Sequence, residues 1–303
     1  MSLRLILGKA LARGLVKPAM RRQSTARQAR VAMERGARLL LRDPPGTLAR
    51  DWGQGGLRVA CGPVAEDAAI LYFHGGGYIA GSPATHRAML ARLSARSGLP
   101  AVLPAYPLAP EHPAPAAFEA ALDAWKALRA EGIGADRIVL GGDSAGGGLA
   151  LALLSHLCGA GEGPAGAFAL SPWTDLTLSG RSLALNAWRD PLLPVARIGE
   201  LRAMVLGDLA PEDPRISPLF AAFPHCPPVF LQVAETEILR DDTLRMADHL
   251  RRDGAMVTLD LWDDGIHAWP LAGRWLPEAG AALDRVATFL DRLNLRSPRP
   301  AGN

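Results

Sequence analysis

Short apolar segments alternate with helical patterns from about residue 57 onward, and this alternation is the feature that most constrains the fold. Helices are expected at 84–98, 113–132, 144–159 and about 277–293, between or after these segments. The segments predicted as strands are AAILYF (68–73), LPAVLPAY (99–106), RIVLGG (137–142), GAFALS (166–171), VFLQVA (229–234) and VTLDLW (257–262). They nearly lack polar alternation, which is typical of strands buried on both faces. The pattern therefore predicts an α/β protein whose mostly parallel central sheet is flanked by helices.

Two regions interrupt the alternation, the basic N-terminus and a segment at about 175–226 that is rich in Pro, Arg and Leu. Both are candidates for a lid over the carboxyl edge of the sheet, where open α/β sheets bind ligands. The expected main domain spans residues 51–293. Residues 294–303, which end in RSPRPAGN, are predicted to form a disordered tail.

The N-terminal segment is strongly basic, because residues 1–42 hold eleven lysines and arginines against one acid, whereas the rest of the chain holds 22 against 29. One helical stripe carries Leu3, Leu7, Leu11 and Leu15, and the stripe roughly opposite carries Lys9, Arg13 and Lys17. We expect this helix to pack on the body with its basic face in solvent. Contact with a membrane surface is the alternative. Nucleic acid is not an expected partner, since no binding motif is present and the remainder is acidic.

Composition excludes several classes of protein. No apolar run approaches the roughly 18 residues of a membrane-spanning helix, and Lys9 and Arg13 interrupt the apolar region that a secretory signal would need. Cys61, Cys158 and Cys226 are widely spaced, odd in number and without a CxxC pair. This disfavours a disulfide framework and a zinc site and fits a reducing compartment. The chain is therefore expected to be cytoplasmic, with no metal or organic cofactor.

Ser144 lies in a G-x-S-x-G motif, Gly142 to Gly146, between a predicted strand and a predicted helix. Such a tight strand-to-helix turn requires small flanking residues and exposes the serine Oγ at the edge of the sheet. It also places the Ala145 N–H at a helix N-terminus, aimed at developing negative charge. Ser144 is therefore predicted to be a nucleophile. A mere tight turn is the alternative, and a phosphate-binding turn is disfavoured because neither a P-loop lysine nor GxGxxG is present.

His74 and three glycines follow a predicted strand in the segment LYFHGGGY (71–78). Successive glycines let backbone N–H groups approach a ligand without hindrance, and a tetrahedral oxyanion requires such preorganised donors. The segment is predicted to form part of an oxyanion hole, with a flexible loop as the alternative. His74 is expected to orient the loop rather than act as the base.

HGGG followed about 70 residues later by GDSAGG resembles the hormone-sensitive-lipase-like family of α/β-hydrolases. YPLAPEHPAPAAFEA (106–120), SPWTDLT (171–177) and RISPLF (215–220) are further matches, and the resemblance covers roughly residues 57–293. It implies an α/β-hydrolase fold with a helical cap built from residues 1–50 and part of 175–226. It also implies that the oxyanion donors are the N–H groups of Gly76, Gly77 and Ala145. The chain departs from the family's Asp-Tyr-Arg at residues 105–107, where it has Ala-Tyr-Pro.

His267 is the predicted general base. In α/β-hydrolases the order along the chain is serine, acid, histidine, and His267 follows a late predicted strand in a loop that could return to the edge of the sheet. It also resembles the family's Gly-x-x-His-Gly-Phe segment, although Gly265 lies only two residues before it and Ala268 and Trp269 replace Gly-Phe. Trp269 is expected to line a substrate pocket, with core packing as the alternative.

Glu237 is the predicted acid of the triad. The family pattern Ala-Glu-x-Asp-Pro-Leu-x-Asp, laid on residues 234–241, places Glu237 where the family has its catalytic aspartate. The role requires an ionised carboxylate that accepts a hydrogen bond from histidine Nδ1, and Asp and Glu both serve in α/β-hydrolases. Asp241 and Asp242 are the alternatives, although their place at the start of a predicted helix favours capping roles.

Together these residues predict a serine carboxylesterase that acts on short- to medium-chain carboxylic esters, with lactones as a further class, through an acyl-enzyme. The alternatives are an amide or thioester hydrolase with the same site, a membrane-associated lipid hydrolase, and a non-catalytic receptor for a small ligand. A small-molecule ester is the expected partner, and the oligomeric state, including a homodimer, is left open.

Overall fold

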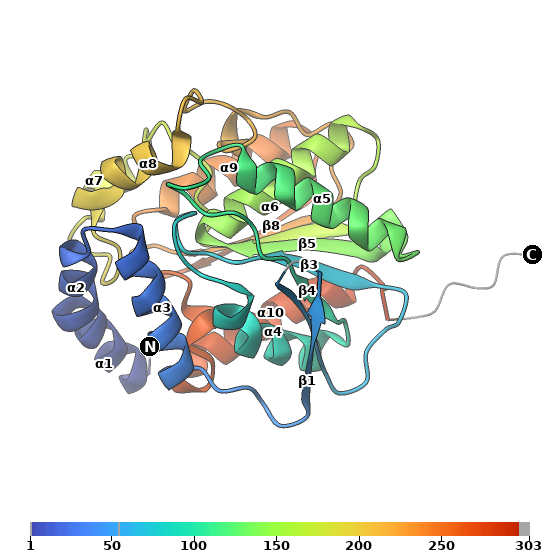
Figure 1. Ribbon diagram of the computed structural model, residues 1–303, viewed down its shortest axis with the longest axis horizontal. Helices are drawn as coiled ribbons and strands as arrows, with labels where there is room; N and C mark the ends of the chain where they lie inside the picture. Colours follow the sequence, from blue (N-terminus) through green and yellow to red (C-terminus); the bar gives the residue numbers. More distant parts are fainter. Residues whose placement is uncertain (1, 54, 297–303) are drawn as a thin grey trace, which may run out of the picture.

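An eight-stranded sheet forms the centre of the computed structural model, which describes residues 2–53 and 55–296. The strand order is β1-β2-β4-β3-β5-β6-β7-β8 (Figure 1). β2 pairs antiparallel with both β1 and β4, and the other neighbouring strands pair parallel. The strands are β1 (Thr47–Trp52), β2 (Gly56–Cys61), β3 (Ala69–Phe73), β4 (Ala101–Leu103), β5 (Ile138–Asp143), β6 (Gly166–Leu170), β7 (Val229–Ala234) and β8 (Val257–Trp262). The α/β class with a mostly parallel sheet is confirmed.

Helices cover both faces of the sheet, with α5, α6 and α9 on one side and α4 and α10 on the other (Figure 1). Strand β3 explains the missing polar alternation, because Leu71 and Phe73 point into the core on the α6 side while Ile70 and Tyr72 point into the core on the α4 side. These helices are α4 (Pro83–Ser97), α5 (Ala116–Ala130), α6 (Ser144–Gly159), α9 (Arg240–Arg252) and α10 (Pro277–Asp291). Short 3-10 turns are η2 (Ala135–Arg137), η4 (Pro218–Phe220) and η5 (Trp269–Trp275).

Both ends of the predicted domain differ from the expected boundaries. β1 begins at Thr47, inside the segment 1–50 expected to consist of cap helices; the strand lies at the edge of the sheet with mostly exposed side chains, so it carries no apolar signal. At the other end Leu295 is buried in the core beside α10, and Arg296 Nε donates to the Ser97 carbonyl at 2.6 Å. The start of the predicted tail is therefore packed on the body, and its remaining part, residues 297–303, lies outside the described residues.

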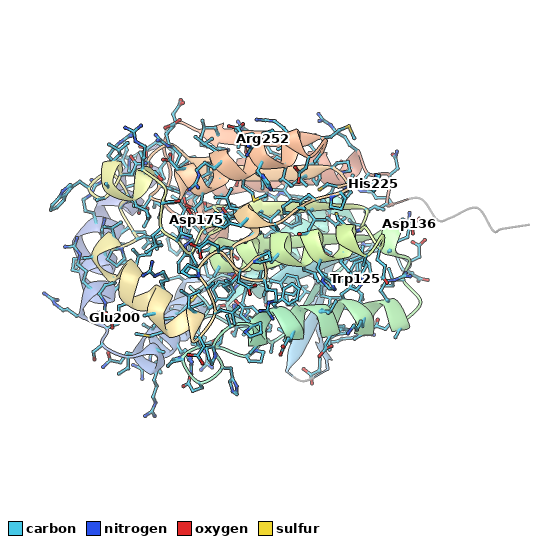
Figure 2. All side chains as sticks on the ribbon, turned by 90° about the horizontal axis from the view of Figure 1, so that it is seen from above. Trp125, Asp136, Asp175, Glu200, His225 and Arg252 are labelled. Atoms are coloured by element: carbon cyan, nitrogen blue, oxygen red, sulfur yellow. The ribbon has the colours of Figure 1, made fainter. Side chains whose placement is uncertain are left out.

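The two regions that interrupt the alternation lie together at one end of the molecule (Figure 1). Figure 2, turned by 90°, shows Glu200 of α8 at the same end as the N-terminal helices. Lys17 Nζ donates to the carbonyls of Ala187 at 3.0 Å and Asp190 at 2.7 Å, and Arg197 donates to the Arg21 carbonyl at 2.9 Å. The helices involved are α1 (Leu3–Leu11), the π-helical turn η1 (Ala12–Val16), α2 (Lys17–Arg22), α3 (Ala26–Leu40), α7 (Ser182–Leu185), η3 (Val195–Arg197) and α8 (Ile198–Leu206).

The first helix has the orientation opposite to the one expected. Its leucine stripe faces outward, with Leu3, Leu7, Leu11 and Leu15 between 55% and 71% exposed. The stripe predicted to be solvated faces the body instead: Lys9 pairs with the Asp264 carboxylate, Arg13 donates to the Arg189 carbonyl at 3.0 Å, and Lys17 is buried. The body thus supplies hydrogen-bond acceptors to these cations, and the leucine stripe remains in solvent. No helix among the described residues is long and apolar enough to cross a membrane.

Candidate active site

Ser144 is the first residue of α6 and adopts a φ of +53°, in the left-handed region that side chains rarely occupy. Close backbone packing fixes its neighbours as glycine. A Cβ on Gly142 would lie 2.2 Å from the Gly146 carbonyl oxygen, and a Cβ on Gly146 would lie 2.1 Å from that of Phe73. Ser144 stays partly exposed while the residues on either side are buried. The turn therefore presents the serine side chain at the carboxyl end of β5.

Glu237 and His267 are joined by a hydrogen bond of 2.7 Å between Oε2 and Nδ1. Glu237 is fully buried, and its other carboxylate oxygen accepts hydrogen bonds from Ser171 Oγ at 2.9 Å and from the Ala234 amide at 2.8 Å. A carboxylate that accepts at Nδ1 places the imidazole proton there and leaves Nε2 as the basic nitrogen. Three donors thus fix the carboxylate that orients the histidine.

Nε2 of His267 is buried and has no hydrogen-bond partner in the part of the chain that the structure describes. Burial disfavours the charged imidazolium, but the hydrogen bond and the charge of Glu237 favour it, and the net effect is to raise the pKa of His267 above 6.5. The charge of Asp143, which precedes Ser144, contributes in the same direction. The base nitrogen is therefore free, and the imidazole lies within electrostatic reach of the nucleophile turn.

The glycine loop after β3 offers free backbone donors. In residues 2–53 and 55–296 the amides of Gly76 and Gly77 donate no hydrogen bond, and the Ala145 amide belongs to the first turn of α6, where N–H groups have no helical acceptor. Gly76 and Gly77 have φ values of +124° and +63°. A Cβ on Gly77 would lie 2.9 Å from Leu201 of α8, so α8 lies directly over this loop. The structure thus leaves all three amides free to serve as oxyanion donors.

Asp143 connects the glycine loop to the nucleophile turn. Its buried Oδ1 accepts hydrogen bonds from the Gly75 amide at 3.0 Å and the Tyr72 hydroxyl at 2.9 Å, and it lies 3.1 Å from His86 Nε2. Burial acts to raise the pKa of Asp143, but His86 and the hydrogen bonds outweigh it and the pKa is lowered. One ionised carboxylate therefore joins two segments that are 68 residues apart. Sequence reasoning assigned no role to Asp143 or His86, although an acid inside the GDSAGG motif was a usable signal.

Comparison with known proteins identifies the family. Residues 70–271 match the family model described as the alpha/beta hydrolase fold. The crystal structure of an esterase from the bacterial hormone-sensitive lipase family superposes with a TM-score of 0.91 at 33% identity, covering 97% of this chain and 99% of that chain. The chain belongs to the hormone-sensitive-lipase family of α/β-hydrolases. The fold and the family expected from the motifs are both confirmed.

Two curated relatives share most of this hydrolase's length. An esterase of Acinetobacter venetianus is 37% identical over 228 residues, which cover 75% of each chain. An acetyl-hydrolase of Streptomyces hygroscopicus is 35% identical over 230 residues, which cover 75% of this chain and 77% of that one. The similarity to these relatives shows that this hydrolase is an esterase.

The raised pKa of His267 sets the expected pH dependence of this esterase. As the predicted general base, His267 can accept a proton only as the neutral imidazole, so kcat/KM should fall as the pH drops through the pKa of His267. Because that pKa lies above 6.5, the midpoint of the acid limb should also lie above pH 6.5. The check is the pH profile of kcat/KM for an uncharged nitrophenyl ester. A midpoint below pH 6.5 would contradict the assigned environment of His267.

His74 is packed at the base of the glycine loop of the esterase and is held there by Tyr106. Its ring stacks on Tyr106 with centroids 4.2 Å apart, and the Tyr106 hydroxyl donates to the His74 carbonyl at 2.7 Å. Burial, together with the nearby His86, lowers the pKa of His74 to about 3, so the ring is neutral. Residues 105–107 differ from the family pattern, but Tyr106 is the residue that they share with it, and Tyr106 holds the glycine loop directly.

Two buried residues of the segment 175–226 hold the loop that carries Glu237. Asn186 Nδ2 donates to the carbonyls of Glu235 at 2.8 Å and Glu237 at 2.7 Å. Asp190 Oδ2 accepts from the Ile238 amide at 3.0 Å. Sequence reasoning missed both residues, because their partners lie about 50 positions away and no motif marks them.

The two alternative acids have other partners. Asp242 Oδ2 accepts from the amides of Thr174 at 2.9 Å and Asp175 at 3.0 Å, and burial raises its pKa to about 7. Asp241 Oδ2 accepts from the Ser182 amide at 2.9 Å. Among the described residues, neither carboxylate forms a hydrogen bond with the histidine of the site. Both lie in the first turn of α9, but neither caps that helix as expected, because its N-cap is Leu239 and the two carboxylates accept from amides of another segment.

Trp269 lies in the core rather than on a pocket wall. It is 2% exposed and packs in a buried cluster with Leu5, Ala234 and Leu276. Its ring centroid lies 5.3 Å from that of Trp262. This placement favours core packing, which was the alternative for Trp269. The indole shares its buried cluster with Leu5, so it links α1 to the loop that carries His267.

Proposed function

We propose that the enzyme hydrolyses short- to medium-chain carboxylic esters with Ser144 as nucleophile, His267 as general base and Glu237 as acid. The observation that carries the proposal is the state of the His267 ring. Nδ1 is hydrogen-bonded to the buried carboxylate of Glu237, while Nε2 has no hydrogen-bond partner in the described part of the chain. An imidazole held in this way is ready to accept a proton at Nε2.

In the proposed mechanism His267 Nε2 takes the Oγ proton as Ser144 attacks the ester carbonyl. The carbonyl oxygen becomes an oxyanion that accepts hydrogen bonds from the amides of Gly76, Gly77 and Ala145. Glu237 stabilises the imidazolium, which then gives its proton to the departing alcohol and leaves an acyl-enzyme. Water deprotonated by the neutral imidazole attacks this acyl group, and the imidazolium then returns the proton to Ser144 Oγ as the carboxylic acid departs.

Two observations support small acyl groups. Leu201 of α8 lies directly over Gly77, so an apolar cap side chain limits the space beside the proposed oxyanion donors. The relative from Streptomyces hygroscopicus is named an acetyl-hydrolase. We therefore place the preferred substrates among esters of short or medium acyl chains.

The test is a series of nitrophenyl esters from acetyl to palmitoyl. We expect kcat/KM to be highest between the acetyl and octanoyl esters and to fall for palmitoyl, because a long chain must pass the cap. A matched butyryl nitroanilide measures the competing amide activity. Absence of turnover on every ester, a maximum at palmitoyl, or faster turnover of the anilide than of the ester would each overturn the proposal.

A further inference from the structure

Exposed apolar side chains gather where α1 lies beside the end of α3. Leu39 and Trp275 are 76% and 54% exposed, and Leu40 is also exposed. Trp275 Nε1 donates to the Leu40 carbonyl at 2.8 Å, and Arg4 of α1 contacts the Arg274 carbonyl at 3.5 Å, so these segments adjoin. We call this surface the leucine face, and its members are Leu3, Leu7, Leu11, Leu39, Leu40 and Trp275.

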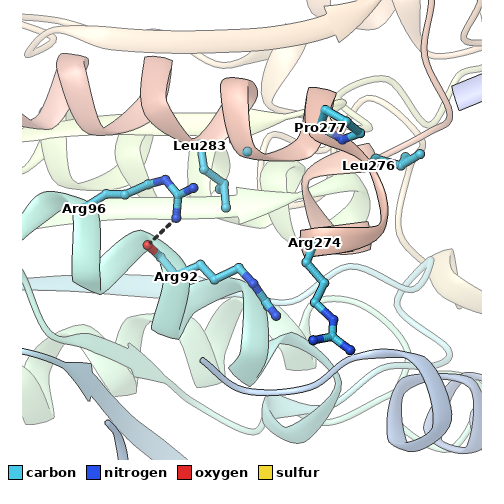
Figure 3. A pocket seen from close by; sticks show the side chains of 8 residues that line it. Arg92, Arg96, Arg274, Leu276, Pro277 and Leu283 are labelled. Carbon is cyan, nitrogen blue, oxygen red and sulfur yellow. Dashed lines mark hydrogen bonds between the residues drawn. The ribbon is translucent and has the colours of Figure 1, made fainter. Parts of the chain in front are cut away.

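A pocket lined by three arginines adjoins the leucine face, because Arg274 precedes Trp275 in the chain. Arg92, Arg96 and Arg274 line it, and the guanidinium groups of Arg92 and Arg274 point toward one another (Figure 3). Arg92 donates to the carbonyls of Ala88, at 2.7 Å, and Arg42. Burial and the charges of Arg96 and Arg274 lower the pKa of Arg92 in spite of a nearby aspartate. Arg96 is already paired with Asp284 at 2.6 Å, whereas Arg92 and Arg274 form no ion pair among the described residues, so the pocket is a cationic recess that an anion would stabilise.

Charge decides which partner suits the leucine face. A two-fold contact between copies of the chain would bring the arginines beside this face, Arg4, Arg92 and Arg274, close to their copies. Like charges that face one another across such a contact repel. An anionic bilayer instead offers an apolar interior to leucine and tryptophan and phosphates to arginine. We propose that the leucine face docks on an anionic lipid membrane and that the arginine pocket receives lipid phosphate groups.

The docked helix would lie directly against the loop of the base. Gly8 of α1 packs on Ile266, since a Cβ on Gly8 would lie 3.2 Å from its side chain, and Lys9 forms an ion pair with Asp264. Ile266 and Asp264 both lie within three residues of His267. Docking through α1 therefore turns the active-site end of the enzyme toward the lipid, with the first helix between the membrane and the base.

Flotation of the full chain with lipid vesicles tests the proposal. Vesicles of phosphatidylcholine alone are compared with vesicles that also contain phosphatidylglycerol. We expect binding to the anionic vesicles, weaker binding at high salt because charges are screened, and little binding to pure phosphatidylcholine. The double variant Leu7→Gln/Leu11→Gln, at exposed positions, should bind anionic vesicles at least about tenfold more weakly, since each leucine loses apolar burial in the lipid.

Met256→Gln is the matched control. Met256 is 72% exposed but precedes β8, and its carbonyl accepts from the first residue of β7, so it lies at the amino edge of the sheet, away from the leucine face. Its vesicle binding should equal that of the wild type. Absence of binding to anionic vesicles, equal binding to both lipids, or unchanged binding of the double variant would overturn the proposal. A lipid-free dimer that the double variant dissociates would instead assign the leucine face to a second copy.

Discussion

Ser144→Ala should lower kcat/KM for a short-chain nitrophenyl ester by about five to six orders of magnitude, the scale seen when a triad nucleophile is removed. The physical reason is that no other group in the proposed mechanism can form the acyl-enzyme. Free amides of the glycine loop would still stabilise an oxyanion formed by water attack, so a residual rate above the uncatalysed reaction should remain. Stopped assays at high enzyme concentration measure that residual rate.

Ser155→Ala controls for the loss of a serine on the same helix. Ser155 Oγ donates to the Ala222 carbonyl at 2.7 Å, and this contact does not involve the site. Activity of this variant should therefore stay close to that of the wild type. The thermal unfolding of Ser144→Ala should also remain cooperative, because alanine is smaller than serine and the glycines around it are unchanged. Retention of more than about a tenth of the activity in Ser144→Ala would exclude the proposed nucleophile.

The sequence predicted the strands that are buried on both faces, and also the partly exposed β8, but it missed β1 and β2. β3, β5, β6 and β7 are uniformly buried, so their apolar runs stand out. β1 has mostly exposed side chains and is held by pairing with β2, an interaction between backbones that leaves no apolar signature. A local pattern could therefore identify the layers of the fold but not the antiparallel pair β1–β2 at one edge of the sheet.

The orientation of the first helix was predicted wrongly for a related reason. A leucine stripe was expected to face the body, because burial of apolar surface is the usual source of helix packing. Lys9 instead finds its partner in Asp264, 255 residues away, and Lys17 finds carbonyl acceptors in the cap segment. No local pattern contains such distant acceptors.

The residues of the site divide along the same line. Ser144, His267 and the glycine loop could be found because each lies in a motif whose local geometry carries its meaning. Asn186 and Asp190 could not, because their hydrogen bonds to the acid loop exist only after the cap segment has folded against it. Motifs thus point to the groups that are proposed to react, and tertiary structure shows the groups that hold them.

Glu237→Gln should lower kcat by about three to four orders of magnitude, as for other triads in which the acid becomes an amide. Glutamine has nearly the shape of glutamate, and its oxygen can still accept the bonds from Ser171 Oγ and the Ala234 amide. Its NH2 group would then face His267 Nδ1 and place the imidazole proton on Nε2. In that tautomer Nε2 cannot accept the proton of Ser144.

The pH profile separates this effect from a general loss of structure. The hydrogen bond and the charge of Glu237 raise the pKa of His267 against the effect of burial, so their removal should move the acid limb of the residual activity to lower pH. Asp241→Asn is the matched control, because that carboxylate contacts Arg240 and the Ser182 amide. It should cost less than about tenfold in kcat and leave the acid limb in place. A larger loss in Asp241→Asn than in Glu237→Gln would assign the acid to the first turn of α9, against the 2.7 Å contact between Glu237 and His267.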